Sequence, residues 1–185
     1  MTVQPLGWDD DETADRLSGV ADLVRDVPDF PEPGVLFRDT TPVLANAEAL
    51  TVVATELAAL VGDAELVAGV EARGFLIGSA VAVVAGVGVV PVRKAGKLPR
   101  VAASRSYALE YGEATLELPD GVVAAGTRVF VVDDVLATGG TAAATCALLA
   151  DVGAVATGFG TLVELTALGG RVALGDIEVH SLVTY

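Results

Sequence analysis

Residues 128–150 read RVFVVDDVLATGGTAAATCALLA, and this stretch decides how the rest of the chain is interpreted. Its first part, Val129–Val132, is a run of β-branched and aromatic residues that is too short for a helix and lacks polar alternation. Such a run predicts a strand buried on both faces of a parallel sheet. Asp133 and Asp134 follow at its carboxyl end, where open α/β sheets bind ligands. We therefore expect an α/β fold with this strand near its centre.

The turn after the two carboxylates has the composition of a phosphate-binding site. Small residues lead into a helix predicted to begin near Gly140, namely Ala137, Thr138, Gly139, Gly140 and Thr141. The free N–H groups and positive dipole end of a helix start favour an anion, and the threonine hydroxyls can add hydrogen bonds. Two carboxylates beside a phosphate suit sugar hydroxyls or a hydrated Mg²⁺. Together these groups predict a site for a pentose 5-phosphate.

Other interpretations of this stretch are weaker. No lysine follows the glycines as in GxxxxGK[ST], and the GxGxxG pattern is absent from the chain, so two common nucleotide-binding motifs are excluded. A structural alternative is a buried strand that enters a helix through a glycine turn, with the aspartates as caps. Capping, however, does not require two carboxylates four residues ahead of TGGT.

Length and composition point to one soluble domain. A chain of 185 residues is long enough for one well-packed domain and short for two. The formal charge of −14 argues against nucleic-acid binding, because phosphate backbones need a positive surface. The longest apolar run, Ile77–Val92, is interrupted by glycine and serine, which argues against a membrane span. The chain has one cysteine, Cys146, and no export signal at its start, so we expect a cytoplasmic protein.

Charge is unevenly distributed along the chain. Residues 1–32 hold nine acidic and two basic residues, and residues 1–12 show no periodicity, so we expect an acidic mobile tail before a single domain over residues 13–185. Five of the eleven basic residues form a basic segment without any acid: Arg93, Lys94, Lys97, Arg100 and Arg105. In so acidic a protein this segment predicts an anion site, although a solvated basic loop is the alternative.

Apolar periodicity gives the order of the elements. We expect helices at residues 13–27, 46–61 and 75–85, strands at 66–70, 87–92 and 114–118, and two final strands at 154–165 and 177–184 joined by a glycine-rich turn. Strands that alternate with helices predict a largely parallel sheet, whose carboxyl ends meet at one edge. That edge would gather the carboxylates, the phosphate turn and the basic segment. His180 alternates with apolar residues and is interpreted as a structural strand residue.

Three further segments carry possible functions. Glu71, Ala72, Arg73 and Gly74 lie between a strand and a helix, which predicts a second anion site or else a local ion pair. Residues 29–44 hold three prolines, which favour an extended path that could present Leu36, Phe37 and Arg38 to a flat heterocycle. The long stretch 101–113 is interpreted as a lid loop, with a solvent-exposed hairpin as the alternative.

Residues 129–141 resemble the phosphoribosyl pyrophosphate signature of the type I phosphoribosyltransferases. With this signature, DFPEPGVLFRD, GVEARGFLIG, PVRKAGKLP, SYALEYG and VELTALGG resemble the adenine phosphoribosyltransferase family over residues 29–185. The resemblance implies a largely parallel sheet flanked by helices, with a small N-terminal hood mainly at residues 29–44. It also implies Mg²⁺-dependent transfer of the phosphoribosyl group to N9 of adenine, as part of purine salvage, in a cytoplasmic homodimer.

The same resemblance assigns roles to individual residues. Leu36 (backbone) and Arg38 would read the adenine edge while Phe37 packs on it. Residues 71–74 would form the pyrophosphate loop, in which a non-proline cis peptide is common in the superfamily. Arg93, Lys94 and Lys97 would neutralise pyrophosphate, with one of them reaching across the dimer interface. Asp133 and Asp134 would hold the ribose hydroxyls, with Mg²⁺ carried mainly by the substrate and reaching these carboxylates through water.

Catalysis in this family implies a closing lid and a proton acceptor. Arg73 and Glu110 would be the catalytic residues, with Glu110 as the general base or hydrogen-bond partner for adenine. Tyr107 and Tyr111 would belong to the lid. Two departures stand out: the acidic tail has no counterpart, and the lid is less polar than the family pattern. The alternatives are a phosphoribosyltransferase for hypoxanthine or guanine, and a regulator that senses phosphoribosyl pyrophosphate without catalysis.

Overall fold

The computed structural model describes residues 10–108 and 113–185. The helices are α1 (Asp10–Leu23), α2 (Thr41–Ala45), α3 (Ala47–Ala59), α4 (Arg73–Ala85), α5 (Gly140–Asp151) and α6 (Gly170–Leu174), with a 3₁₀ helix, η1 (Thr166–Leu168). The strands are β1 (Arg25–Pro28), β2 (Leu36–Asp39), β3 (Leu66–Val70), β4 (Gly88–Lys94), β5 (Val101–Ala108), β6 (Glu113–Pro119), β7 (Arg128–Leu136), β8 (Val155–Glu164) and β9 (Val179–Thr184). None of the described helices is long and apolar enough to cross a membrane.

The central sheet is largely parallel, as the alternation of elements predicted. Its strand order is β5-β6-β4-β3-β7-β8-β9, in which β4, β3, β7, β8 and β9 run parallel to one another. The β5–β6 hairpin adds two antiparallel strands at one edge. Because β7 lies between β3 and β8, Asp133 and Asp134 are at the carboxyl end of an inner strand. The two carboxylates therefore lie at the sheet edge where the sequence predicted the ligand site.

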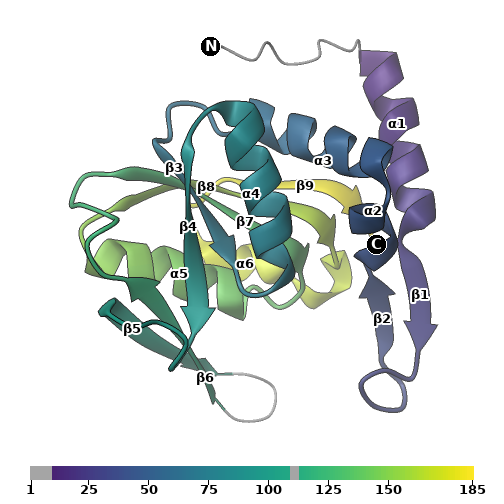
Figure 1. The fold of residues 1–185 in the computed structure, drawn as a ribbon. Coiled ribbons are helices and arrows are strands. Elements are labelled where there is room, and N and C mark those ends of the chain that lie inside the picture. The colour runs from purple at the N-terminus through teal and green to yellow at the C-terminus, as the bar shows by residue number, and fades with distance from the viewer. Residues whose placement is uncertain (1–9, 109–112) are drawn as a thin grey trace.

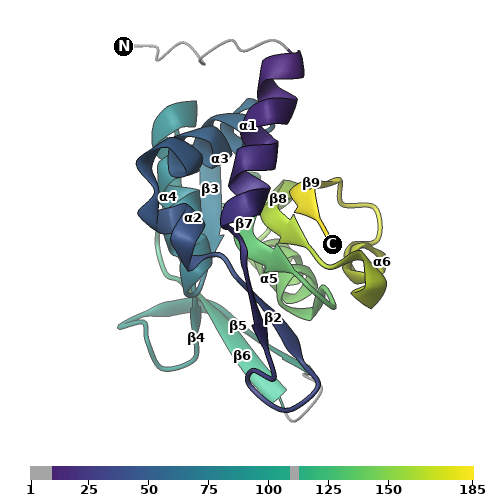
Figure 2. The same cartoon turned by 90° about the vertical axis from the view of Figure 1, so that its right-hand side faces the viewer.

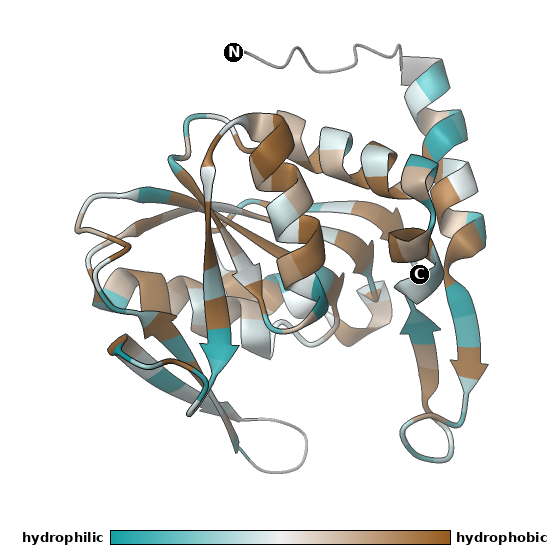
Figure 3. Cartoon of the chain, viewed as in Figure 1, coloured by the Kyte–Doolittle hydropathy of each residue, from teal (hydrophilic) through white to brown (hydrophobic). Residues whose placement is uncertain are grey.

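Two apolar clusters sandwich the sheet. Phe130 and Val132 of β7 pack with α1, α3 and α4 on one face, while Val129 and Val131 pack with α5 on the other. Figure 1 shows these helices on opposite sides of the strands, and Figure 3 shows hydrophobic stretches within the inner strands. The interpretation of residues 129–132 as a strand buried on both faces is confirmed.

The N-terminal part differs from the expected helix over residues 13–27. The helix α1 ends at Leu23, and Arg25–Pro28 instead form β1, which pairs antiparallel with β2. The pairs Arg25–Asp39 and Asp26–Arg38 join the two strands across this ribbon, so a tertiary pairing that the local pattern does not encode outweighs helical periodicity. We call β1, β2 and the turn between them the hood, and it shares residues 29–39 with the predicted hood. Figure 2 shows the hood extending beyond the sheet below α1.

Residues 101–108 are not a loop. They form β5, which pairs with β6 in an antiparallel hairpin, and the Ser106 and Thr115 hydroxyls contact each other across it at 2.8 Å. The hairpin alternative is thus correct for this part of the predicted lid, because pairing with β6 holds these residues in a strand. Figure 1 shows the hairpin and the hood projecting from the same end of the molecule.

The last two strands also differ from the expectation of a glycine-rich turn. β8 and β9 are parallel, so the chain must cross over between them, and η1 and α6 form that connection. β8 (Val155–Glu164) closely matches the strand predicted at residues 154–165.

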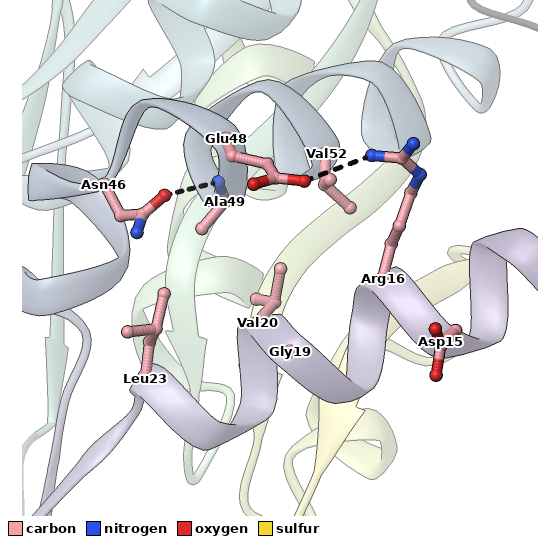
Figure 4. A pocket seen from close by; sticks show the side chains of 9 residues that line it. All are labelled: Asp15, Arg16, Gly19, Val20, Leu23, Asn46, Glu48, Ala49 and Val52. Atoms are coloured by element: carbon pink, nitrogen blue, oxygen red, sulfur yellow. Dashed lines mark hydrogen bonds and ion pairs between the residues drawn. The ribbon is translucent and has the colours of Figure 1, made fainter.

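The helices α1 and α3 lie side by side, and residues of both line a cavity of about 380 Å³. Figure 4 shows Val20 and Leu23 pointing toward α3, with the Arg16 guanidinium reaching Glu48 across the gap at 3.4 Å. Asn46 caps α3 by accepting a hydrogen bond from the Ala49 amide at 3.0 Å. The contacts between α1 and α3 hold α1, the helix that precedes the hood, against the core.

Candidate functional site

A cavity of about 590 Å³ opens at the carboxyl edge of the sheet. Segments that are far apart in the sequence form its wall: the hood, the turn after β3, the ends of β4 and β7, the β5–β6 hairpin, the start of α5 and the loop after β8. The residues that line it are Val35, Leu36, Phe37, Arg38, Glu71, Ala72, Arg73, Lys94, Tyr107, Ala114, Leu116, Asp133, Asp134, Val135, Ala137, Thr141, Leu165 and Leu168. Most of the residues expected to bind substrate therefore surround one space.

The turn before α5 forms a smaller cavity of about 80 Å³ that shares Asp133, Val135, Ala137 and Thr141 with the larger one. Gly139 has a φ of +81°, which favours glycine, and among the described residues no side chain caps the first N–H groups of the helix. Local conformation and free donors thus agree with the predicted phosphate cradle, which we define as residues 137–141.

The helix α6 supports the cradle from behind. A Cβ atom on Gly139 would lie 2.2 Å from the carbonyl oxygen of Gly170, so the two backbones touch. Arg171 on α6 donates two hydrogen bonds of 2.7 Å to the buried Glu164 at the end of β8. These bonds lower the pKa of the Glu164 carboxyl and fix α6 against the cradle. The cradle is consequently held by backbone packing rather than by flexible side chains.

The two carboxylates at the end of β7 have different surroundings. Asp134 is buried, and its Oδ2 accepts a hydrogen bond from the Thr40 hydroxyl at 2.8 Å and pairs with the Arg73 Nε at 2.9 Å. Asp133 accepts a hydrogen bond from the Asp134 amide at 2.8 Å. Burial raises the pKa of Asp133 well above its usual value, and the neighbouring Asp134 charge raises it further. Asp134 is therefore already fixed by protein groups, which the sequence did not indicate.

The loop from Glu71 to Gly74 is compact and touches β7. The peptide bond between Glu71 and Ala72 is cis, as the family resemblance implied. A Cβ atom on Gly74 would lie 2.8 Å from Asp133 Oδ1, so only glycine permits this approach. Arg73 enters the main cavity, where its guanidinium lies 5.3 Å from the Phe37 ring centroid. Arg73 is thus the cation that stands between the hood and the carboxylates.

The basic segment contributes unequally to the site. Arg93 pairs with Glu71 at 3.3 Å and also donates to the Lys97 carbonyl at 3.2 Å, so it braces the loop and does not line the main cavity. A hydrogen bond from the Lys94 amide, together with Arg93, lowers the pKa of Glu71. The Lys94 side chain lines the main cavity, whereas Lys97 is exposed beyond it. The local ion pair considered for this loop forms, but its cation is Arg93 rather than Arg73.

The hood presents an aromatic and apolar wall to the cavity. Phe37 contacts Phe30 edge-to-face with ring centroids 5.1 Å apart, and Leu36 is 46% exposed. Arg38 also lines the cavity, but its guanidinium pairs with Asp26 and lies 3.9 Å from the centroid of the Tyr185 ring. Arg38 is consequently held at the back of the hood, where it fixes the wall.

The β5–β6 hairpin closes the cavity on the side opposite the hood. The Tyr107 hydroxyl and the Thr141 Oγ1 are 3.0 Å apart, which links β5 to the cradle. Arg105 donates two hydrogen bonds, of 2.9 and 2.6 Å, to Asp151 at the end of α5. Its guanidinium is thus paired with a carboxylate of the protein. The predicted residues Glu110 and Tyr111 lie outside the described residues.

Sequence reasoning missed three residues that shape this site. Thr40 and Asp26 hold Asp134 and Arg38, and Tyr185 stacks on Arg38 while its hydroxyl donates to the Ala21 carbonyl at 3.3 Å. Each acts through a tertiary contact. A local pattern could at most have indicated Asp26, through alternation with Arg25 in a strand.

Comparisons with known proteins agree with this geometry. Residues 43–180 match the model of the phosphoribosyl transferase domain family. The chain is 57% identical over 166 residues to an adenine phosphoribosyltransferase of Mycolicibacterium vanbaalenii, covering 89% of this chain and 95% of that protein. The crystal structure of adenine phosphoribosyltransferase from Thermoanaerobacter pseudethanolicus superposes with a TM-score of 0.87 at 43% identity, covering 91% of this chain and 99% of the other. The Saccharomyces cerevisiae enzyme, solved in complex with adenine and an imino-altritol bisphosphate, superposes with a TM-score of 0.85 at 34% identity, covering 91% and 99% of the two chains.

Proposed function

This chain belongs to the adenine phosphoribosyltransferase family, and on that premise we propose that it transfers the phosphoribosyl group of phosphoribosyl pyrophosphate to N9 of adenine. The products are AMP and pyrophosphate, and the reaction serves purine salvage. The observation that carries this proposal is the continuous cavity of about 590 Å³, which runs from the Phe37 wall to the end of β7 and the cradle. Base, ribose and phosphate sites must be contiguous for this reaction, and the cavity provides that continuity.

The cavity divides into three subsites. The cradle, residues 137–141, receives the 5-phosphate through its N–H groups and the Thr138 and Thr141 hydroxyls. Asp133 and Asp134 face the ribose hydroxyls. Phe37 packs on adenine, while the Leu36 backbone and the Arg38 region read its edge.

The leaving group needs positive charge. As the bond between C1 of ribose and pyrophosphate breaks, positive charge grows on the ribose and negative charge on pyrophosphate. Arg73 and Lys94 line the cavity and stabilise pyrophosphate more as its charge grows, which lowers the barrier. Arg93 assists indirectly, because its pair with Glu71 braces the loop that carries Arg73.

Adenine loses its N9 proton as N9 bonds to C1, and we assign Glu110 as the proton acceptor. We assign a lid role to Tyr107 of β5 and, by family resemblance, to Tyr111, so that water which could otherwise attack C1 is excluded. The variant Glu110→Gln should lower kcat by about 10² while the Kd for phosphoribosyl pyrophosphate is kept. Glu113→Gln, at the start of β6, is the matched control. Wild-type turnover in Glu110→Gln would remove Glu110 from this role.

Mg²⁺ fits this site as an ion carried by the substrate. The described residues contain no group of three or more His, Cys, Asp or Glu side chains that could hold a metal ion, but Asp133 lines the cavity and can contact a hydrated ion. Bound Mg²⁺ would neutralise phosphate charge. Asp134 contributes less to binding this ion, because its Oδ2 already contacts Thr40 and Arg73.

A homodimer is part of the same proposal. Leu76 and Val83 on α4 are 58% and 74% exposed, and Figure 3 shows hydrophobic colour along the outward side of this helix. A second copy of the chain that covers α4 would bring its own pyrophosphate loop nearby, because α4 begins at Arg73. Light scattering should give twice the chain mass for the wild type and the single-chain mass for Val83→Asp. A monomeric wild type would refute the dimer. A cytoplasmic location rests on the sequence alone.

The decisive experiment is a base panel. Purified protein with Mg²⁺ and phosphoribosyl pyrophosphate is offered adenine, hypoxanthine, guanine or uracil in turn, and AMP and pyrophosphate are measured. We expect pyrophosphate to be released with adenine alone. Release with hypoxanthine or guanine would keep the cradle but overturn the assignment of the hood to adenine. Binding of phosphoribosyl pyrophosphate without turnover of any base would favour a sensor.

A further inference from the structure

Thr40 lies where the hood joins the core. It follows the last residue of β2 and precedes α2, and its side chain is fully buried. Its hydroxyl donates a hydrogen bond of 2.8 Å to Asp134, which is 94 residues away in the sequence. The strand that carries the base-facing Phe37 is therefore tied to a carboxylate of the ribose subsite.

A buried carboxylate depends on its donors. Burying a charge without hydrogen bonds is costly, and the Oδ2 of Asp134 meets two donors, Thr40 and Arg73. The two donors differ in how far their side chains can move. The Arg73 side chain is 33% exposed and stands in the cavity, so it can turn toward pyrophosphate, whereas Thr40 is buried and cannot leave. Thr40 is thus the donor that remains when Arg73 engages the substrate.

We propose that Thr40 is a positioning residue for phosphoribosyl pyrophosphate, which acts by holding the Asp134 carboxylate in place for the ribose hydroxyls. The inference rests on the proposed function and deepens it, because it assigns the residue that follows the hood to the ribose side of the reaction. Arg38 in the hood and Thr40 just after it then serve different substrates: Arg38 fixes the adenine wall, and Thr40 fixes the ribose carboxylate. Loss of the hydroxyl would let Asp134 turn wholly to Arg73 and would hold that cation away from pyrophosphate.

The test compares Thr40→Val, which keeps the shape and removes the hydroxyl, with Thr40→Ser, which keeps the hydroxyl. Thr55→Val removes another buried hydroxyl, on α3, and is the matched control. Kinetics with each substrate varied should show the KM for phosphoribosyl pyrophosphate rising about tenfold in Thr40→Val, since a hydrogen bond to a charged group is lost. The KM for adenine should change less than about twofold, and Thr40→Ser and Thr55→Val should resemble the wild type.

Calorimetric titration with phosphoribosyl pyrophosphate and Mg²⁺ separates the outcomes. A Kd raised about tenfold in Thr40→Val and restored to the wild-type value in Thr40→Ser would support the positioning role. Wild-type affinity in Thr40→Val, or a loss that Thr40→Ser does not restore, would overturn it. If the wild type forms no AMP, the proposed reaction fails, but the titration still decides whether Thr40 serves the ribose carboxylate.

Discussion

The cradle and the hood face each other across one cavity, yet they are built by opposite means. The cradle is a continuous segment, residues 137–141, whose shape follows from Gly139 and from backbone contact with α6. The hood is a two-stranded ribbon whose side chains are fixed by partners elsewhere, such as Asp26 and Tyr185 around Arg38. In the proposed assignment the phosphate meets mainly backbone donors, which any sequence with the right turn supplies, whereas the base site also depends on side chains such as Phe37 and Arg38. The invariant part of the substrate thus meets the region shaped by local backbone conformation, and the part that defines specificity meets the region shaped by side-chain contacts.

The largest effect should come from breaking the cradle. Gly139→Ala forces a side chain at a φ of +81° and places its Cβ 2.2 Å from the Gly170 carbonyl oxygen. We expect a loss of about 3 kcal/mol in the free energy of unfolding and at least about a hundredfold in kcat/KM. Urea unfolding and steady-state kinetics measure both. Gly121→Ala, with a φ of +78° and an open surrounding, should cost only about 1 kcal/mol and no activity. Equal effects of the two variants would show that the contact with α6 is unimportant.

Arg73 lies between the two regions, and its loss should rank second. Arg73→Gln keeps an N–H donor near Asp134 but removes the charge, so kcat should fall about a hundredfold or more. Arg100→Ala is the control, because the Arg100 side chain is 81% exposed and its surface pair with Asp120 contributes little. Stopped-flow or steady-state assays with saturating substrates give kcat directly. A decrease below about threefold would mean that Arg73 does not stabilise the departing pyrophosphate.

A change in the hood should affect only one substrate. Arg38→Ala removes the contacts with Asp26 and Tyr185, so the KM for adenine should rise about tenfold while the KM for phosphoribosyl pyrophosphate stays within about twofold. The matched control is Arg25→Ala, which removes the other cross-strand pair of the same ribbon. Unchanged adenine kinetics in Arg38→Ala would count against the hood as the base site.

The smallest effect should come from Asp39, at the end of the hood. Hydrogen bonds from Thr41, followed by Arg25, lower the pKa of Asp39 to about 2. Because the folded pKa is depressed, its stabilising contribution is present above the ordinary pKa of 3.8 and is lost as the pH falls toward 2. With allowance for solvent screening, Asp39→Asn should cost about 1 kcal/mol at pH 7 and clearly less at pH 3. Urea unfolding at both pH values tests this, and a cost independent of pH would contradict it.

The same contrast explains what could be predicted from the sequence. The fold, the buried strand at residues 129–132 and the cradle follow from short patterns, and the bounds of β3 match the predicted strand at residues 66–70. Such elements depend on neighbours in the chain. The C-terminal end of α1 and the hairpin strand β5 were missed, because each depends on pairing with the next strand along the chain, which the pattern of the segment itself does not encode.

The side-chain roles were harder to predict than the elements. Arg93, which was predicted to neutralise pyrophosphate, also pairs with Glu71, and Asp134, which was predicted to hold the ribose hydroxyls, also contacts Thr40 and Arg73. No local signal marks these pairs, since their members lie on different elements. The comparison with solved relatives fixes the family, while the partners of each side chain come only from the structure.

The most direct test of the account is a crystal structure of the protein with AMP bound. The account predicts the phosphate on the backbone N–H groups of the cradle, the ribose beside Asp133 and Asp134, and the adenine ring against Phe37. Adenine bound away from the hood, or a phosphate outside residues 137–141, would contradict the division of the cavity into a backbone-built phosphate site and a side-chain-built base site.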